Sequence, residues 1–271
     1  SAVEGTVLDP DFRSFVGLHP LPLRHGMTIG EIGLLVQRDH YPRAKLDVLK
    51  MIGWDRDSYG DQNGYAWVMP SPNMPTVDTA VVYPGGCLIE GTNLSEGRGT
   101  TQPFETIGAP WLNGQQLAER LNARKFPGVY FRAVPFEPTF NKYAGQICNG
   151  VFVHVIDRNT FRPVLSYLAL IRECIRQTGL HESSHAKLEK FKAASPETEL
   201  PGFAWKQPPY EYEFSKMPID ILLGNGWMRP LLEQETDFEF LQKTMENECN
   251  TFISHSKSCK IYEEGRRKLG F

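Results

Sequence analysis

The chain has 271 residues, of which 41% are hydrophobic, so it is long enough to bury one large core or two moderate ones. Its formal net charge is −3 and its lysines and arginines are scattered along the sequence, which argues against nucleic acid as a partner. No apolar run approaches the ~20 residues that a membrane span requires, and the first residues lack the charged and apolar regions of a signal peptide.

The N-terminal region predicts a helix followed by a strand. Apolar residues recur at helical spacing over residues 24–41, and residues 45–54 alternate as in a short strand. Such a unit is typical of a parallel sheet, yet no earlier unit of this kind precedes it. Two interpretations stay open: a small antiparallel or mixed sheet that is complete in itself, or a fragment of a larger sheet. A fragment would expose an apolar edge near residues 47–54 and would self-associate or bind its missing half.

The rest of the chain alternates helical and strand patterns, which predicts the α/β class. The expected elements are a strand at 81–90, a helix at 114–124, a strand at 126–140, a strand at 150–158, a helix at 161–179 closed by Gly179, and an amphipathic helix at 237–254. Residues 193–218 are rich in proline and aromatic residues, which favours irregular structure. Five cysteines occur without a C-x-x-C pair, so no disulfide framework is indicated, although a Cys249–Cys259 bridge stays open.

The stretch EGTNLSEGRGTTQPFETIGAPW, residues 90–111, is the strongest sign of a binding site. It places three carboxylates, an arginine and many small hydroxyl residues between two apolar segments. Glu90 is expected where a strand gives way to a loop, a position at which α/β folds place ligand-contacting groups. Such a loop suits a sugar, a phosphate or a carboxylate. Its GRGTT segment lacks the lysine of a nucleotide-binding loop, which argues against nucleotide binding.

Four sequence blocks carry a family resemblance. They are SFVGLHPLPLRHGMTIGE, WVMPSPNMPT, YPGGCLIEGTNLSEGRGTTQPFETIGAPW and FEPTFNKYAGQICNGVFVHV. In this order they resemble the bacterial exo-β-N-acetylmuramidase (NamZ-like) family over residues 4–156, with weaker similarity toward the C-terminus. The resemblance implies the end of a Rossmann-like domain at residues 1–58, a smaller α/β domain at residues 59–271, and an active site in the cleft between them.

The same resemblance implies a function. Family members release terminal N-acetylmuramic acid from the non-reducing end of peptidoglycan-derived chains, so a peptidoglycan-derived sugar and a secreted or periplasmic location are expected, with no cofactor. The family's acidic PEHG-type motif would lie before Ser1, and no such motif occurs in this sequence. Two interpretations stay open: an exo-acting hydrolase that is incomplete in this chain, possible partners being the missing N-terminal portion or a second copy, or a non-catalytic module that binds amino sugars.

Glycoside hydrolysis requires two carboxyl groups, or one carboxyl group together with the acetamido group of the substrate. The catalytic candidates are Glu31, Glu90 and Glu96, and Glu105 is a further carboxylate of the binding stretch. Each has a structural alternative. Glu31 lies in a T-x-x-E capping box, and Glu90 would form a salt bridge with Arg98. Glu96 and Glu105 would be solvated or bound by backbone N–H groups.

N-acetylmuramic acid differs from glucosamine by a lactyl carboxylate, which a guanidinium binds well. Arg98 and Arg24 are the candidate partners, or else they pair with the glutamates. His25 could bond a hydroxyl or carboxylate, although a lone histidine is more often a turn residue. Short polar residues that would bond sugar hydroxyls, or form turns instead, are Ser71, Asn73, Asn93, Ser95, Thr100 and Thr101. Trp111 and Trp67 would stack on a sugar ring or pack in the core.

Neither a metal site nor a cysteine nucleophile is expected. His181 and His185 stand at i and i+4, but the serine-rich stretch around them indicates an exposed helical face. Cys87 has no adjacent base and precedes an apolar segment, which indicates a packed thiol.

Overall fold

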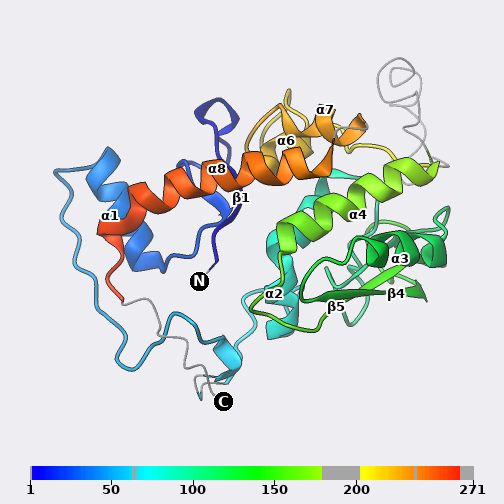
Figure 1. Cartoon of the computed structure of the whole chain (residues 1–271), viewed down its shortest axis with the longest axis horizontal. Coiled ribbons are helices and arrows are strands. Elements are labelled where there is room, and N and C mark those ends of the chain that lie inside the picture. Colours follow the sequence, from blue (N-terminus) through cyan, green and yellow to red (C-terminus); the bar gives the residue numbers. More distant parts are fainter. Residues whose placement is uncertain (1, 63, 65, 179–201, 235–236, 263–271) are drawn as a thin grey trace.

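The computed structural model describes residues 2–62, 64, 66–178, 202–234 and 237–262. In this part the chain is mixed α/β, with a two-stranded sheet, a three-stranded sheet and helices packed around them (Figure 1). The α/β class predicted from the sequence is confirmed. All strand pairs in both described sheets are antiparallel, so the pairing is not the parallel kind that an N-terminal αβ unit would favour.

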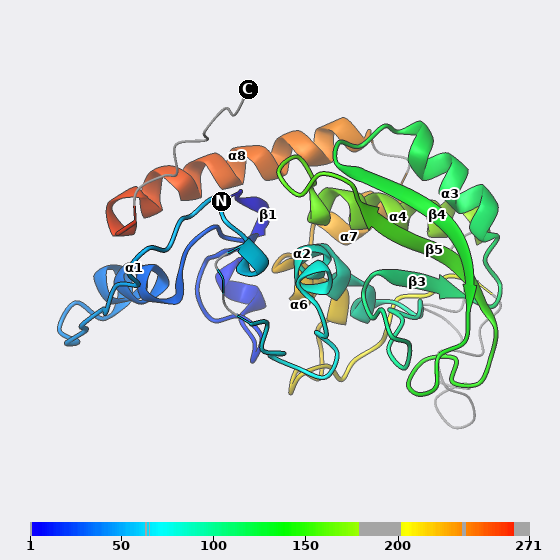
Figure 2. The same cartoon turned by 90° about the horizontal axis from the view of Figure 1, so that it is seen from below.

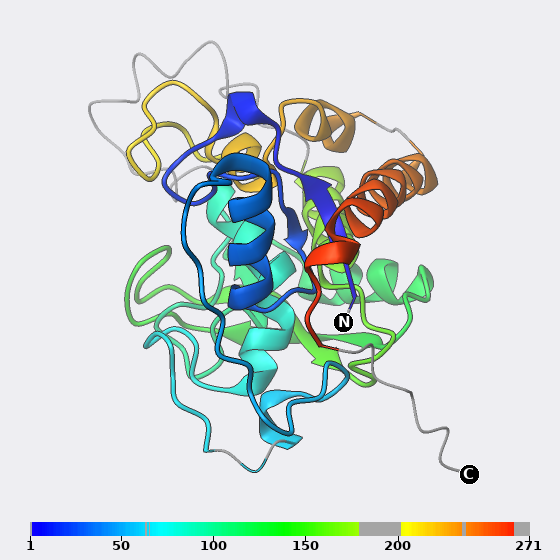
Figure 3. The same cartoon turned by 90° about the vertical axis from the view of Figure 1, so that its left-hand side faces the viewer.

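The N-terminal segment forms a two-stranded ribbon followed by one helix. Strand β1 (Glu4–Val7) pairs with β2 (Pro22–Arg24), and the short helix η1 (Pro10–Phe12) lies between them in sequence. The helix predicted over residues 24–41 is present as α1 (Ile29–His40). In Figure 3 the ribbon and α1 lie side by side, with the end of the last long helix next to α1.

The start of α1 has the predicted capping box. The Thr28 hydroxyl accepts a hydrogen bond of 3.3 Å from the Glu31 N–H, and Oε2 of Glu31 accepts one of 2.9 Å from the Thr28 N–H. Two donors that the first turn of a helix leaves unpaired are satisfied in this way. The structural interpretation of Glu31 is therefore confirmed.

The strand predicted at residues 45–54 is wrong, because this described segment contains no strand. Two of its apolar side chains pack against helix α1 instead of pairing in a sheet. Leu46 and Val48 pack against Gly33 and Gly30 of α1, where an added Cβ would come within 3.2 Å and 2.5 Å of them. Alternating apolar residues mark two sides of a segment, but they do not specify which kind of element covers each side.

The three-stranded sheet has the order β3 (Thr106–Ala109), β5 (Cys148–Val155), β4 (Val129–Phe136). The pairing register places Ile107 opposite Val151 and Phe131 opposite Val153. Strands β4 and β5 confirm the strand predictions for residues 126–140 and 150–158. Figure 2 shows the sheet with α3 and α4 along it.

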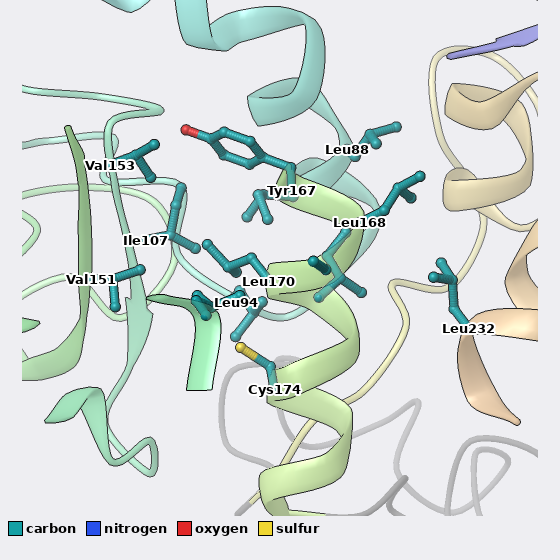
Figure 4. Close-up of a cluster of buried hydrophobic side chains, with 14 of the residues drawn as sticks. Leu88, Leu94, Ile107, Val151, Val153, Tyr167, Leu168, Leu170, Cys174 and Leu232 are labelled. Atoms are coloured by element: carbon teal, nitrogen blue, oxygen red, sulfur yellow. The ribbon is translucent and has the colours of Figure 1, made fainter. Parts of the chain in front are cut away.

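Helices α3 (Gly114–Ala123) and α4 (Pro163–Thr178) confirm two helix predictions. All side chains from Pro163 to Ile175 are buried, which makes α4 the central element of the main hydrophobic core. Figure 4 shows side chains of α4 between the sheet and neighbouring segments. Gly179, predicted to close this helix, lies outside the described residues.

The apolar run at residues 81–90 is helical, so the strand predicted there is wrong. Helix α2 (Val77–Gly86) begins after Thr76, whose hydroxyl accepts a hydrogen bond of 3.1 Å from the Thr79 N–H, and it leads directly into the short helix η3 (Cys87–Gly91). A short apolar run fits a buried strand and a buried helix equally well, since both are surrounded by core.

The C-terminal region is helical. It comprises α6 (Pro218–Leu223), α7 (Met228–Glu233), α8 (Phe238–Ser256) and the short helix η6 (Lys257–Cys259). Much earlier in the chain, another short helix, η2, spans Gly60–Gln62. Helix α8 extends across the molecule from the α4 side to α1 (Figure 1). Its predicted apolar face is confirmed, because four side chains are buried at the expected spacing: Phe238, Leu241, Met245 and Phe252.

All five cysteines are free thiols, so the open Cys249–Cys259 bridge is not formed. In the described parts of residues 193–218 the backbone from 202 to 217 is irregular, as predicted. No helix in the described ranges is long and apolar enough to cross a bilayer. The division into domains 1–58 and 59–271 stays a prediction.

Candidate functional site

A cavity of about 380 Å³ lies between the N-terminal segment and the α2–η3 corner. Residues 6–25 form one wall, residues 83–90 form another, and Tyr210 together with the end of α6 completes it. Most of the lining is apolar. The side chains with ionisable groups are His19, His25, Tyr83, Cys87, Glu90 and Tyr210. A mainly apolar cavity with a few convergent polar groups is the usual form of a small-molecule site.

Glu90 projects from η3 and is held at both carboxylate oxygens. Its Oε1 accepts a hydrogen bond of 2.8 Å from Nη2 of Arg98, and its Oε2 accepts one of 3.0 Å from the hydroxyl of Tyr210. The side chain retains 18% of its accessible surface. Gly91 permits this placement, because a Cβ there would lie 2.8 Å from the Ile219 backbone. The carboxylate is therefore oriented but still accessible.

Arg98 connects two carboxylates. Besides Glu90 it binds Glu96, through a 2.8 Å hydrogen bond from Nε to Oε1, and its guanidinium lies 5.2 Å from the centre of the Phe104 ring. Burial disfavours the charged guanidinium, but the two carboxylates outweigh burial and raise the pKa of Arg98. The salt bridge predicted between Glu90 and Arg98 is confirmed.

The loop that carries Arg98 depends on two glycines. Gly97 and Gly99 have φ angles of 73° and 82°, in the left-handed region that favours glycine. A Cβ on Gly99 would also lie 2.6 Å from the backbone nitrogens of Thr139 and Phe140. The GRG sequence is thus required by the backbone path that brings the guanidinium to Glu90.

Lys142 anchors the other end of this charge network. Its Nζ donates hydrogen bonds to the carbonyls of Ile89 (3.2 Å) and Leu94 (2.9 Å) and to Oε2 of Glu96 (3.0 Å). Burial lowers the pKa of Lys142. Burial would raise the pKa of Glu96, but Lys142, then a backbone N–H and then Arg98 outweigh burial and hold the pKa of Glu96 below its ordinary value. Two cations and two carboxylates alternate, so the network compensates its own charge.

His25 reaches the same cavity from the N-terminal side. Its Nδ1 accepts a hydrogen bond of 3.1 Å from the Met27 N–H, which leaves Nε2 to carry the proton of the neutral ring. Burial lowers the pKa of His25, so the neutral form is favoured near pH 7. The ring can therefore donate one hydrogen bond from Nε2.

Glu31 does not line this cavity. Its side chain is fully buried and forms an ion pair with Arg56, and Oε1 also accepts a hydrogen bond of 2.9 Å from the Ile261 N–H. Burial opposes ionisation, but Arg56 and these donors outweigh it and lower the pKa of Glu31. Glu31 and Glu90 therefore do not meet in this cavity, and Glu31 connects α1 to the segment after α8.

The polar side chains of several predicted binding residues form hydrogen bonds with backbone groups of the protein. Asn93 bonds the Gly202 carbonyl (2.8 Å) and the Ala204 N–H (2.9 Å). Ser95 accepts a hydrogen bond of 3.2 Å from the Gly97 N–H, and the Thr100 hydroxyl donates one of 2.6 Å to the Gly97 carbonyl. These side chains shape the loop around Arg98, as the turn interpretation predicts.

Among the described residues, Glu90 and His25 are the only predicted site residues that line the cavity, and the other candidates lie outside its lining. Arg24 donates a 3.4 Å hydrogen bond to the Phe161 carbonyl, and Ser71 accepts one of 3.3 Å from the Asn73 N–H. Glu105 is buried against the Thr79 hydroxyl, at 2.7 Å, and burial raises the pKa of Glu105. The indole of Trp111 donates a hydrogen bond of 3.1 Å to the Tyr143 hydroxyl and packs on the main core.

Four residues at the site were not predicted from the sequence: His19, Tyr83, Lys142 and Tyr210. Tyr210 belongs to the aromatic-rich irregular segment, where no periodicity indicates which ring turns inward. Burial raises the pKa of Tyr83 to about 12 and that of Tyr210 well above its usual range, so both hydroxyls remain protonated donors. Lys142 lies in one of the resembling blocks, but nothing local in the sequence points to Glu96.

The structure supports the interpretation of Cys87 as an unreactive thiol. Its Sγ contacts the Pro84 carbonyl at 3.6 Å, and burial raises the pKa of Cys87 to about 12. Within the described ranges, no group of three or more His, Cys, Asp or Glu side chains is arranged to hold a metal ion. His181 and His185 lie outside those ranges, so their arrangement is not described.

Two family profiles match the sequence. The one described as "Exo-beta-N-acetylmuramidase NamZ, C-terminal" matches residues 81–262, and the one described as "Exo-beta-N-acetylmuramidase NamZ, N-terminal" matches residues 1–78. A curated relative, the peptidoglycan beta-N-acetylmuramidase NamZ of Bacillus subtilis (strain 168), is 41% identical over 261 residues, which cover 96% of this chain and 56% of the relative. The chain thus spans little more than half the length of that relative.

Two crystal structures of DUF1343 family proteins from Bacteroides fragilis NCTC 9343 share the fold. One matches with a TM-score of 0.78 at 24% identity, and the other with a TM-score of 0.65 at 20% identity. Each match covers 97% of this chain and 63% of the other chain. At these identities the likeness establishes the fold alone.

Proposed function

The chain belongs to the exo-beta-N-acetylmuramidase NamZ family, and from this premise we propose that it serves a glycoside hydrolase that releases N-acetylmuramic acid from the non-reducing end of peptidoglycan fragments. The curated relative is a peptidoglycan beta-N-acetylmuramidase. In the described part of the chain, the observation that carries the proposal is the Glu90 carboxylate, oriented by Arg98 and Tyr210 at the wall of a 380 Å³ cavity.

Glu90 is the proposed catalytic carboxylate. Among the described residues that line the cavity, it is the only Asp or Glu. Glycoside cleavage with a single protein carboxylate needs a second group, which the acetamido substituent of the sugar or a carboxyl group outside this cavity wall would supply. Arg98 keeps Glu90 oriented, and the neutral His25 ring would donate a hydrogen bond to the bound sugar.

Arg98 is also the proposed contact for the lactyl carboxylate of muramic acid. Two of its nitrogens bind Glu90 and Glu96, and its side chain keeps 23% of its accessible surface. Arg98 does not itself line the cavity, so this contact would be made beside Glu90 through Nη1, which makes no hydrogen bond among the described residues. A guanidinium that is held in place by two carboxylates loses little entropy when it binds a third acceptor.

A second candidate function is sugar binding without hydrolysis. The single carboxylate in the cavity lining favours this alternative, because recognition needs no acid and base pair. Both functions involve a peptidoglycan-derived sugar and so imply action at the cell wall, in a secreted or periplasmic protein. A further portion of a longer protein or a second copy of the chain would then be partners.

Product analysis tests the proposed function. The protein is incubated with a chromogenic N-acetylmuramide and with peptidoglycan fragments, and the released sugar is identified by mass spectrometry. Glu90→Gln should lower turnover by at least ~10²-fold. Glu119→Gln is the matched control, because Glu119 is exposed on α3 and its hydrogen bond from Gln115 can persist. Sugar binding without release of N-acetylmuramic acid would instead favour the non-catalytic module.

A further inference from the structure

Two exposed aromatic rings meet beside the cavity. Phe15 and Tyr212 have 73% and 79% of their surface exposed, and their ring centres lie 5.4 Å apart in an edge-to-face arrangement with an interplanar angle of 74°. Phe15 directly precedes Val16, and Tyr212 follows Tyr210 by two positions; both Val16 and Tyr210 line the cavity. Each ring is thus one or two positions in the chain from a residue of the cavity wall, and from this adjacency we infer that the pair lies at the rim of the candidate site.

The turn that presents Tyr212 is unusual. Tyr210 and Glu213 exchange two backbone hydrogen bonds of 2.8 Å, so Glu211 and Tyr212 form the tip of a two-residue turn. These two residues have φ angles of 45° and 67°. Positive φ at both central positions normally selects Asn-Gly, because a Cβ is disfavoured in this region. An aromatic side chain at such a position costs stability without any core contact in return.

Hydrogen bonds fix the chain after the turn and connect it to the N-terminal segment that carries Phe15. The Glu213 carboxylate accepts hydrogen bonds of 2.9 Å from the N–H groups of Phe214 and Ser215, which fixes the chain after the turn. Lys216 then reaches the N-terminal segment, where it binds the Asp11 carbonyl and lies 5.5 Å from the ring of Phe12. In Figures 1 and 3 the N-terminal loop and the segment after residue 202 lie side by side.

We propose that Phe15 and Tyr212 form an outer sugar subsite, on which the second sugar ring of a glycan stacks while the terminal N-acetylmuramic acid occupies the cavity. This inference rests on the proposed function. A cavity of about 380 Å³ is near the small end of ligand pockets, which hold ~300–1,000 Å³, and it suits one amino sugar. The remaining glycan must leave through the rim.

The chemistry of the rim fits a pyranose ring. The C–H groups on one face of a pyranose are apolar and weakly positive, and the face of an aromatic ring is weakly negative. Tyr210 and Tyr212 belong to the same short turn, and the hydroxyl of Tyr210 donates the hydrogen bond to Glu90. A sugar stacked on Tyr212 would thus contact the turn whose first residue, Tyr210, binds the carboxylate.

Calorimetry with two ligands tests the subsite. The ligands are N-acetylmuramic acid and a sulfur-linked disaccharide of N-acetylmuramic acid and N-acetylglucosamine, which resists hydrolysis. The wild-type protein should bind the disaccharide about tenfold more tightly than the monosaccharide. Phe15→Ala and Tyr212→Ala should each remove most of this preference and leave monosaccharide affinity unchanged. Tyr130→Ala is the control, since Tyr130 is 52% exposed on β4, away from the cavity lining.

Tyr212→Gly separates a binding role from a structural one. Glycine relieves the positive φ, so this variant should melt at the wild-type temperature or above it while it loses the disaccharide preference. Equal affinity of the wild-type protein for both ligands, or an unchanged preference in both alanine variants, would overturn the subsite and leave the proposed function standing. Failure of the wild-type protein to bind either sugar would overturn both.

Discussion

The hydroxyl of Tyr210 donates a 3.0 Å hydrogen bond to the carboxylate of Glu90, which lies 120 positions earlier in the chain. This bond connects the irregular segment after residue 202 to the short helix η3 and closes one side of the cavity. Because Arg98 binds the other oxygen of Glu90, the carboxylate has little rotational freedom left. An oriented carboxylate is what both sugar recognition and glycoside cleavage require.

Tyr210→Phe tests this relationship. The variant keeps the ring and removes the hydroxyl, so Glu90 loses one donor while the packing is preserved. A hydrogen bond to a charged group contributes about 1.5–3 kcal/mol, so turnover on the chromogenic muramide should fall roughly tenfold to over a hundredfold. Tyr130→Phe, at an exposed position, should have no effect. A fall in melting temperature without loss of turnover would give Tyr210 a structural role only.

Arg98→Ala and Arg98→Lys test the recognition of the lactyl carboxylate. Loss of a charge-assisted contact should weaken binding of N-acetylmuramic acid by about 1.5–3 kcal/mol, roughly tenfold to over a hundredfold, while N-acetylglucosamine is hardly affected. Lysine should restore little, because it lacks the fork that binds Glu90 and Glu96 together. Calorimetry with both sugars decides, and Arg43→Ala, at an exposed position, is the control. Equal weakening for both sugars would assign Arg98 to loop structure.

The sequence predicted elements well where one pattern excludes the alternatives. The long amphipathic pattern of α8 and the long buried helix α4 are examples, because their length rules out strands. The run at residues 81–90 failed for the opposite reason. Its glycines look like strand or turn residues, but Gly85 allows α2 to approach α4 so closely that a Cβ would lie 2.2 Å from the Pro163 carbonyl. Only the tertiary contact explains that glycine.

The candidate site was also predictable only in part, namely where its residues are close together in the sequence. The block 90–111 identified Glu90, Glu96 and Arg98, and their proximity in sequence sufficed to predict the pairing. Lys142 and Tyr210 could not be found in this way, because they come from distant segments that fold onto η3. Glu31 shows the opposite case. A carboxylate near the right motif can be fully committed to a capping box and a buried ion pair.

Glu31→Gln should therefore affect stability and leave the site intact. Removal of one partner from a buried ion pair leaves the other charge uncompensated and costs about 3–5 kcal/mol. Arg56 would lose the Glu31 carboxylate, and the segment at Ile261 would lose an anionic acceptor. Thermal unfolding measures the loss, with Glu119→Gln as control. Below the melting transition turnover should stay within a few-fold of wild type, and a loss comparable to that of Glu90→Gln would return Glu31 to the catalytic set.

Lys142→Met tests the buried end of the charge network. The variant leaves Glu96 without its ammonium partner and removes donors from the Ile89 and Leu94 carbonyls. We expect a loss of about 3–5 kcal/mol of unfolding free energy at pH 7, together with reduced turnover, because the backbone of η3 carries Glu90. Lys243→Met, at an exposed position of α8, should be neutral.

The pH dependence of this loss follows from Glu96. Its folded pKa lies below the ordinary value of 4.5, so the stability it contributes is present above that value and disappears as the pH falls through the folded pKa. The difference between wild type and Lys142→Met should therefore shrink below pH 4.5. The double variant Glu96→Gln/Lys142→Met should be less destabilised than the sum of the single variants, by about 0.5–3 kcal/mol. Strict additivity, with a loss that does not change with pH, would show that Lys142 acts through its carbonyl contacts and not through Glu96.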